Sequence, residues 1–166
     1  MTQSKTIGQF LSSIPPENTA TRAAFFLAGF IMAVWASMVP FVKLNLSLDE
    51  AHLGALLLCV GLGALVVMPF CGGIVAKKGA KYLLRQALFA IPLILFAINF
   101  STHVILTACL LFLFGMVFGS VDVSMNVHAV EVDHRSEKRL IAGFHALYSL
   151  GSVVGALAMA GLLNIG

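Results

Sequence analysis

The residue whose chemistry most needs an explanation is Asp122, because it places a carboxylate inside an apolar stretch. No Asp, Glu, Lys or Arg occurs between Gln86 and Val121. An ionisable group at bilayer depth costs about 2.5 to 3.5 kcal/mol on insertion scales, so it usually faces a cavity or a partner. Asp122 is therefore a candidate for a proton or substrate pathway. The alternative, in which it caps a helix end near the membrane surface or pairs with a nearby arginine, stays open.

Asn126 and two glycines share a helix face with Asp122. Their positions follow the i, i+4, i+7 and i+11 spacing of one helical stripe in the segment G-M-V-F-G-S-V-D-V-S-M-N. Asn126 is well placed to hydrogen-bond a substrate or to orient the acid. Glycines at a G-x-x-x-G spacing let two helix backbones approach closely, which predicts packing rather than binding. The glycines with this expected packing role are Gly115, Gly119, Gly151 and Gly155.

A second polar stripe contains His145, Tyr148, Ser149 and Ser152, at i, i+3, i+4 and i+7 of an apolar run. Histidine changes its charge most readily near neutral pH, so His145 is a candidate proton relay or gate. These side chains either line a pathway or hydrogen-bond to neighbouring helices, and both interpretations stay open. Trp35 falls past the middle of another apolar run, where pathway lining and aromatic packing are the two alternatives.

The composition is that of an integral membrane protein. The 166 residues are 60% hydrophobic and 10% charged, whereas soluble proteins average about 25% charged residues. The net charge of +3 does not indicate nucleic-acid binding. The three cysteines lack C-x-x-C spacing, and no zinc-protease, nucleotide or dinucleotide motif is present. We therefore expect no metal, no cofactor and no enzymatic activity.

Four uncharged runs are long enough to cross the bilayer as helices, which needs about 20 residues each. The longest, Gln86 to Val121, is too long for one crossing and is divided into two spans. The runs predict an all-α polytopic membrane protein with a transmembrane domain over 22–166 and spans at 23–42, 53–76, 84–100, 104–127 and 140–164. Ser47 or Asp49 is expected to cap the second span. The polar residues 99–103 are expected to form a tight turn between the third and fourth spans.

The placement of the basic residues predicts the orientation. With the tail of residues 1–21 in the cytoplasm, nine of the ten Lys and Arg residues face inside and only Lys43 faces outside. The positive-inside rule favours this arrangement. Five spans then put the end of the chain outside without a sixth helix, so we expect that the chain is cut short.

The basic loop between the second and third spans resembles the signature loop of the major facilitator superfamily. The matching residues are Gly72, Lys77, Gly79 and Lys81, whereas Ala76 stands where that pattern has an Asp. Independently of the resemblance, Gly79 permits a turn that a side chain would crowd. The lysines would hold the loop at an anionic leaflet.

The fourth span is similar to the fucose permease branch of that superfamily, in which an acid and an Asn four residues later lie in the substrate and proton pathway. Asp122 and Asn126 match this spacing. The resemblance implies a partial N-terminal six-helix half of a major facilitator fold. It also implies secondary active transport of a small, sugar-like solute by alternating access with proton coupling. The branch's acid in the first span has no counterpart over 23–42, so a two-carboxylate relay is not carried over.

Two classes of function stay open. In the first, the chain is part of a transporter that works in the lipid bilayer on a small-molecule substrate, with a missing C-terminal half or a partner chain. In the second, it is a non-transporting truncated remnant or a small membrane partner protein. Alternating access needs a second half to move against, so the stop after five spans favours the second class.

Overall fold

The computed structural model describes residues 16–136 and 139–165, and every regular element in these ranges is a helix. The helices are α2 (Pro16–Asn45), α3 (Glu50–Lys78), α4 (Ala80–Asn99), α5 (Val104–His134) and α6 (Ile141–Ile165). All five are long and apolar enough to cross a membrane. The expected fold class is confirmed. Residues 16–21 of the expected tail belong to α2, and the rest of that tail lies outside the described residues.

The helix ends follow local chemistry. Asp49 caps α3, since its carboxylate accepts a hydrogen bond from the backbone N–H of His52 at 2.8 Å. Gly79 ends α3 with a φ of +80°, a conformation that glycine adopts without strain. The turn before α5 is held by the Thr107 hydroxyl, which donates to Ser101 Oγ at 2.9 Å. These ends agree with the expected cap, the expected glycine turn and the expected polar break.

Helix α5 continues to His134, seven residues past the expected end of the fourth span at 127. Charged residues end a membrane crossing because they require water, but they do not end a helix. Arg135, just beyond the last turn, donates to the carboxylate of Glu131, an i, i+4 pair that stabilises helical backbone. The helix therefore extends beyond the apolar segment that the hydrophobic pattern detects.

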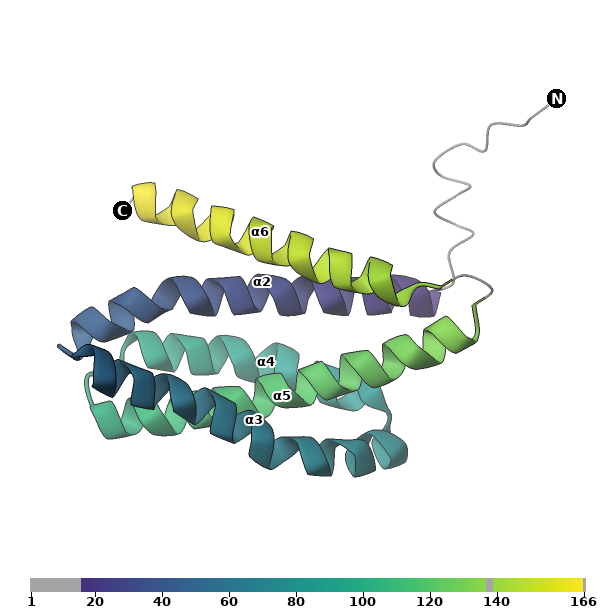
Figure 1. Ribbon diagram of the computed structural model, residues 1–166, viewed down its shortest axis with the longest axis horizontal. Coiled ribbons are helices and arrows are strands. Elements are labelled where there is room, and N and C mark those ends of the chain that lie inside the picture. Colours follow the sequence, from purple (N-terminus) through teal and green to yellow (C-terminus); the bar gives the residue numbers. More distant parts are fainter. Residues whose placement is uncertain (1–15, 137–138, 166) are drawn as a thin grey trace.

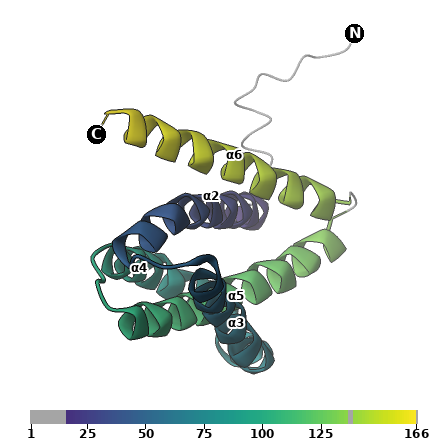
Figure 2. The ribbon, with the colours of Figure 1, turned by 60° about the vertical axis from the view of Figure 1, so that its left-hand side comes forward.

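Two closely packed helix pairs organise the bundle. Figures 1 and 2 show α6 lying along α2 and α3 crossing α5, and α4 packs on α5 as well. Large apolar side chains fill the space between the helices. The fully buried ones are Phe25, Ile91, Ile98, Leu111, Phe114 and Phe144.

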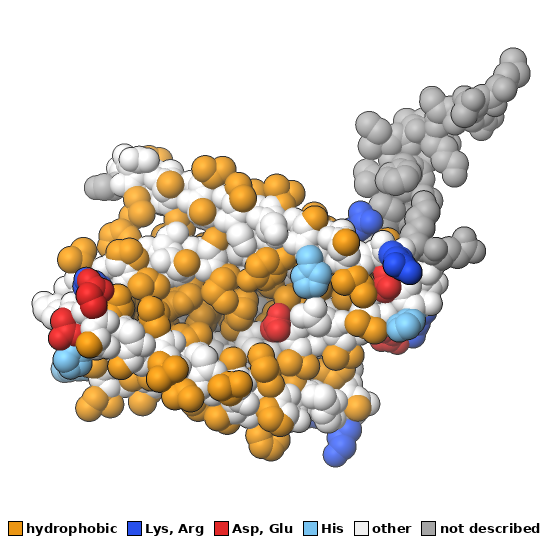
Figure 3. Space-filling view, in the orientation of Figure 1, with side chains coloured by type: hydrophobic (Ala, Val, Ile, Leu, Met, Phe, Trp, Pro, Cys, Tyr) orange, Lys and Arg blue, Asp and Glu red, His pale blue; other side chains and the backbone are white. Residues whose placement is uncertain are grey.

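The outer surface is apolar between two charged ends. Figure 3 shows orange side chains along the length of the helices, with the blue and red groups gathered mainly at the two ends. Leu65, Phe96 and Ile105 are 67%, 67% and 80% exposed. Such side chains are unfavourable in water and favourable in hydrocarbon, so a lipid bilayer is the environment that this surface requires.

A reciprocal pair of glycines brings α3 and α5 into backbone contact. A Cβ atom on Gly115 would lie 2.0 Å from the carbonyl oxygen of Val60 in α3. A Cβ atom on Gly63 would lie 2.1 Å from the carbonyl oxygen of Phe112 in α5. Each glycine thus sits over the carbonyl group three residues before the other glycine. Only the absence of both side chains permits this approach.

Helices α2 and α6 repeat the same geometry. A Cβ atom on Gly29 would lie 2.0 Å from the carbonyl oxygen of Tyr148, and one on Gly151 would lie 2.0 Å from that of Phe26. Again each glycine covers the carbonyl three residues before its partner. Phe-Leu-x-Gly occurs in both α2 and α5, and Leu-Gly in both α3 and α6. The α2–α6 and α5–α3 pairs are therefore copies of one packing arrangement.

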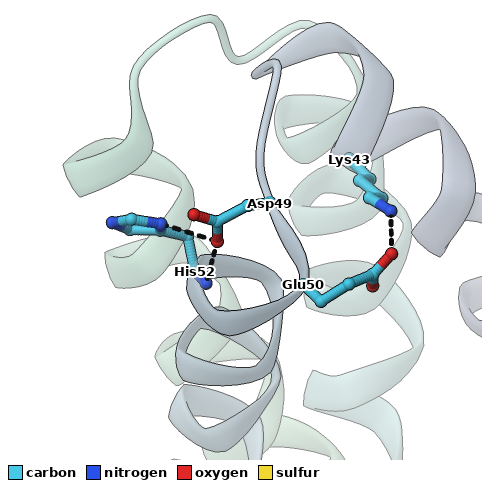
Figure 4. A network of polar contacts seen from close by, with 4 residues as sticks. All are labelled: Lys43, Asp49, Glu50 and His52. Atoms are coloured by element: carbon cyan, nitrogen blue, oxygen red, sulfur yellow. Dashed lines mark hydrogen bonds and ion pairs between the residues drawn. The ribbon is translucent and has the colours of Figure 1, made fainter.

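The loop between α2 and α3 carries a small polar network, which Figure 4 shows. The Asp49 carboxylate contacts both the backbone N–H and the ring Nδ1 of His52, each at 2.8 Å, and Lys43 pairs with Glu50. The pKa of Asp49 lies below its ordinary value, chiefly because the backbone N–H of His52 stabilises the charged carboxylate and secondarily because the His52 ring does. Asp49 therefore stays ionised in moderately acidic solution.

This lowered pKa predicts acid sensitivity. A carboxylate with a depressed folded-state pKa stabilises the fold above its ordinary pKa of about 4, and this contribution is lost as the pH falls through the lower folded value. We expect the thermal midpoint of the detergent-solubilised protein to fall more steeply below about pH 4 than that of Asp49→Asn. Circular dichroism across this range measures both slopes. Equal slopes would mean that the Asp49 cap contributes nothing to the dependence of thermal stability on pH.

Candidate functional site

Asp122 lies within α5 and is half-buried. The side-chain amide of Asn126 donates to the backbone carbonyl of Asp122 at 2.8 Å and to its Oδ1 at 3.3 Å. The helix continues for twelve residues to His134, about 18 Å further at 1.5 Å per residue. Asp122 forms no ion pair with any Lys or Arg among the described residues. Neither the helix-capping nor the arginine-pairing alternative fits this position.

Tyr148 lies within α6 (Ile141–Ile165). Its side chain is half-buried, although α5 and α6 themselves pack mainly on α3 and α2. His145 precedes Tyr148 by one turn and is exposed, with its ring edge-on to Phe25 at a centroid distance of 5.2 Å. We call Asp122, Asn126, His145 and Tyr148 the α5–α6 polar face.

Chemically, the α5–α6 polar face combines one carboxylate, one amide, one imidazole and one phenol. The carboxylate and imidazole exchange protons, and all four groups form hydrogen bonds with hydroxyl-bearing molecules. The half-buried setting of Asp122 leaves one side of its carboxylate available beyond the single Asn126 contact. Side chains of these kinds bind protons and small polar molecules in other proteins.

Trp35 is buried against α5. It is 5% exposed, and its ring centroid is 5.5 Å from that of Phe114 in α5. The packing alternative fits this position, because a buried ring held between two helices is not open to a ligand.

The serines of the second polar stripe are engaged with backbone groups. Ser152 Oγ donates to the carbonyl of Gly29 in α2 at 3.2 Å and to that of Tyr148 at 3.1 Å. Ser149 Oγ donates to the carbonyl of His145 at 3.2 Å. For Ser149 and Ser152 the structure therefore fits the hydrogen-bonding alternative, and Ser152 adds a polar link to the α2–α6 pair.

The signature loop lies at the α3–α4 junction. Lys77 and Lys81 are exposed, and a Cβ atom on Gly72 would meet no other atom within 4 Å. Lys81 lines a cavity of about 580 Å³ together with His128 and Glu131 of α5. The loop is thus adjacent to α5.

Two of the glycines that bring helices together were missed by the sequence reasoning. Gly29 and Gly63 complete the reciprocal pairs with Gly151 and Gly115. The repeated Phe-Leu-x-Gly of α2 and α5 was the available signal for Gly29, and the repeated Leu-Gly of α3 and α6 was the signal for Gly63. The flanking glycines make looser contacts, since a Cβ atom would lie 3.0 Å from Ala64 at Gly119 and 2.7 Å from the Phe30 carbonyl oxygen at Gly155.

Metal binding finds no support in residues 16–136 and 139–165. In these ranges, no three His, Cys, Asp or Glu side chains gather closely enough to hold an ion.

Comparison with known proteins gives three relatives. A protein named as an uncharacterised MFS-type transporter from Yersinia pestis is 41% identical over 152 residues, which cover 90% of this chain and 39% of that protein. An uncharacterised transporter from Sinorhizobium fredii is 39% identical over 81% of this chain and 36% of its own length. Membrane protein MosC from Rhizobium meliloti is 32% identical over 84% of this chain and 34% of its own length.

The matched region is only part of each relative. This chain spans between about a third and two fifths of the length of these curated relatives. No model of a known protein family matches the chain, and no solved structure matches it. Because its helices are long and apolar enough to cross a membrane, the chain is a polytopic membrane protein. Its relatives show that it is related in sequence to MFS-type transporters, that is, to transporters of the major facilitator superfamily.

Proposed function

We propose that this chain is part of a secondary active transporter of the major facilitator superfamily, which moves a small polar, sugar-like solute by alternating access and couples this movement to protons. The observation that carries the proposal is Asp122, a carboxylate within a long apolar helix, together with its Asn126 partner. An intramembrane acid without a basic partner is functional by default. The named relatives support the transporter class.

In the proposed mechanism, Asp122 takes up a proton when the polar face is open to one side of the membrane. It releases the proton when the face opens to the other side. Asn126 orients the carboxylate through the 3.3 Å hydrogen bond and offers its amide to a solute hydroxyl. Tyr148 and His145 contribute hydrogen bonds from α6. The spacing of Asp122 and Asn126 supports the fucose permease branch, and with it a sugar-like solute.

The internal repeat supports the same class of protein. Many transporter folds are built from repeated helical units, with the substrate site at the interface between repeats. The reciprocal glycines pair α2 with α6 and α5 with α3 in one geometry. Alternating access requires a second body to rock against this bundle. The greater length of the relatives supports a C-terminal half as that body, and a partner chain is the alternative source.

The charge distribution supports a cytoplasmic N-terminus, and the bacterial relatives support a location in the inner membrane. Lys77, Lys78, Lys81 and Arg85 lie at the α3–α4 junction, whereas Lys43 lies at the opposite end near the start of α3. An excess of basic residues marks the cytoplasmic side. The α5–α6 polar face would then open to the cytoplasm and to the outside in turn.

Uptake into proteoliposomes tests this function. The native protein that contains this chain is reconstituted, an acid-outside pH gradient is imposed, and the accumulation of radiolabelled hexoses, pentoses and polyols is measured. We expect at least one of these solutes to accumulate above its external concentration and to leak out when a protonophore collapses the gradient.

Two results would contradict the proposal. Solute accumulation that persists after the protonophore is added would show that transport is not coupled to protons. A failure of every hydroxylated solute to enter, with the protein correctly inserted, would remove the sugar-like substrate class and favour a non-transporting membrane partner.

A further inference from the structure

A groove of about 450 Å³ lies beside the α3–α4 junction, away from the α5–α6 polar face. Its walls include Phe70 and Ile74 of α3 and Leu83 of α4. Phe70 is 66% exposed. Gly73 also lines the groove, and a Cβ atom on it would meet no other atom within 4 Å. This part of the groove is therefore an open, apolar channel on the lipid-facing surface.

The end of the groove nearest the loop is positively charged. Lys77 and Lys78 line it, and the Lys78 ammonium lies 4.7 Å from the centre of the Tyr82 ring. Neither lysine pairs with an acidic side chain among the described residues, and no Asp or Glu occurs between Glu50 and Asp122. Helix α4 begins here after Gly79, which has no side chain to cap the helix, and the positive end of the helix dipole lies at this point.

The two ends of the groove match the two ends of a phospholipid. Lys and Tyr side chains at the ends of membrane helices lie at the depth of the headgroups. The apolar walls, one to two turns further along α3, lie at the depth of the acyl chains. Basic pockets between helices on the cytoplasmic side are typical binding sites for acidic headgroups.

We propose that this groove, the α3–α4 groove, binds an anionic phospholipid of the adjacent leaflet. One acyl chain lies along Phe70, Gly73 and Ile74, and the phosphate lies between Lys77 and Lys78. A bound phospholipid explains both why Lys77 and Lys78 have no acidic partner among the described residues and why Gly73 leaves the groove open. The site is independent of the transported solute, and it fixes the α3–α4 loop to the membrane surface.

Native mass spectrometry of the purified full-length protein tests the charged end. Phosphatidylglycerol and phosphatidylcholine with identical acyl chains are titrated separately. We expect phosphatidylglycerol to bind preferentially and Lys77→Gln/Lys78→Gln to weaken its binding about thirtyfold, since each basic side chain near an anionic surface contributes about a fivefold effect. Lys77→Arg/Lys78→Arg retains the binding. Arg139→Gln, which removes an exposed charge outside the groove, leaves the binding unchanged.

A second variant tests the apolar end without changing any charge. A Cβ atom on Gly73 would meet no other atom within 4 Å, so we expect Gly73→Leu to fill the groove without disturbing the fold. It is expected to weaken phosphatidylglycerol binding about tenfold, which corresponds to about two buried CH₂ groups of the acyl chain. Gly61→Leu is the matched control, because Gly61 is an equally open glycine on α3 that does not line the groove.

Three outcomes would overturn the proposal. Equal binding of phosphatidylcholine would exclude an anionic headgroup site. A loss of phosphatidylglycerol binding in Arg139→Gln equal to that in Lys77→Gln/Lys78→Gln would show that binding depends on the net charge of the protein and not on this groove. Unchanged binding in Gly73→Leu would place the acyl chain elsewhere.

Discussion

A Gly115→Ala substitution is expected to cause a loss of stability that is large for the addition of one methyl group. The new Cβ atom would lie 2.0 Å from the carbonyl oxygen of Val60, a separation at which the two backbones must move apart. Overpacking of this kind costs about 1 to 3 kcal/mol, and occasionally more. Separation of α3 from α5 also weakens every other contact of that pair. We therefore expect a clearly lowered thermal midpoint in detergent, followed by circular dichroism.

The control for this prediction is Gly61→Ala on α3. A Cβ atom at Gly61 meets nothing within 4 Å, so the substitution adds the same methyl group without a clash. Its thermal midpoint is expected to equal or slightly exceed that of the wild type, because Ala favours helix over Gly by about 1 kcal/mol. Gly151→Ala should match Gly115→Ala, since its contact with the Phe26 carbonyl has the same 2.0 Å geometry. Equal midpoints for Gly61→Ala and Gly115→Ala would refute the role of the backbone contact.

The spans were predictable from the sequence because the hydrophobic pattern alone determines which segments enter a bilayer. Asp49 and Gly79 were predictable as helix ends for a similar reason, since capping and a positive φ are local properties of single residues. The full length of α5 was not predictable from apolarity, because its last turns are helical in water and are held by the Glu131–Arg135 pair.

The contacts between helices required the structure. The sequence placed Gly115 on a packing face but did not identify α3 as the partner or Gly63 as the reciprocal glycine. It placed Asp122 and Asn126 one turn apart, which local geometry alone provides. The position of Tyr148 depends on how α6 packs along α2, which the order of residues within α6 does not determine.

Asp122→Asn is expected to abolish proton-driven accumulation. The amide has nearly the same size as the carboxyl group and still offers an oxygen to Asn126, so the fold is expected to persist. However, an amide does not bind or release a proton near neutral pH. Solute should then equilibrate across the membrane without being concentrated. Glu131→Gln is the matched control, because it neutralises an exposed acid further along α5 and should preserve accumulation.

The most direct measurement follows the proton itself. Proteoliposomes that contain the native protein are suspended in weakly buffered medium without a pH gradient, the transported solute is added, and the external pH is recorded. The proposed function predicts a rise in external pH as protons enter with the solute. It also predicts no rise for Asp122→Asn, although solute still enters. An equal rise in Asp122→Asn and wild type would contradict the assignment of Asp122 as the proton-carrying group.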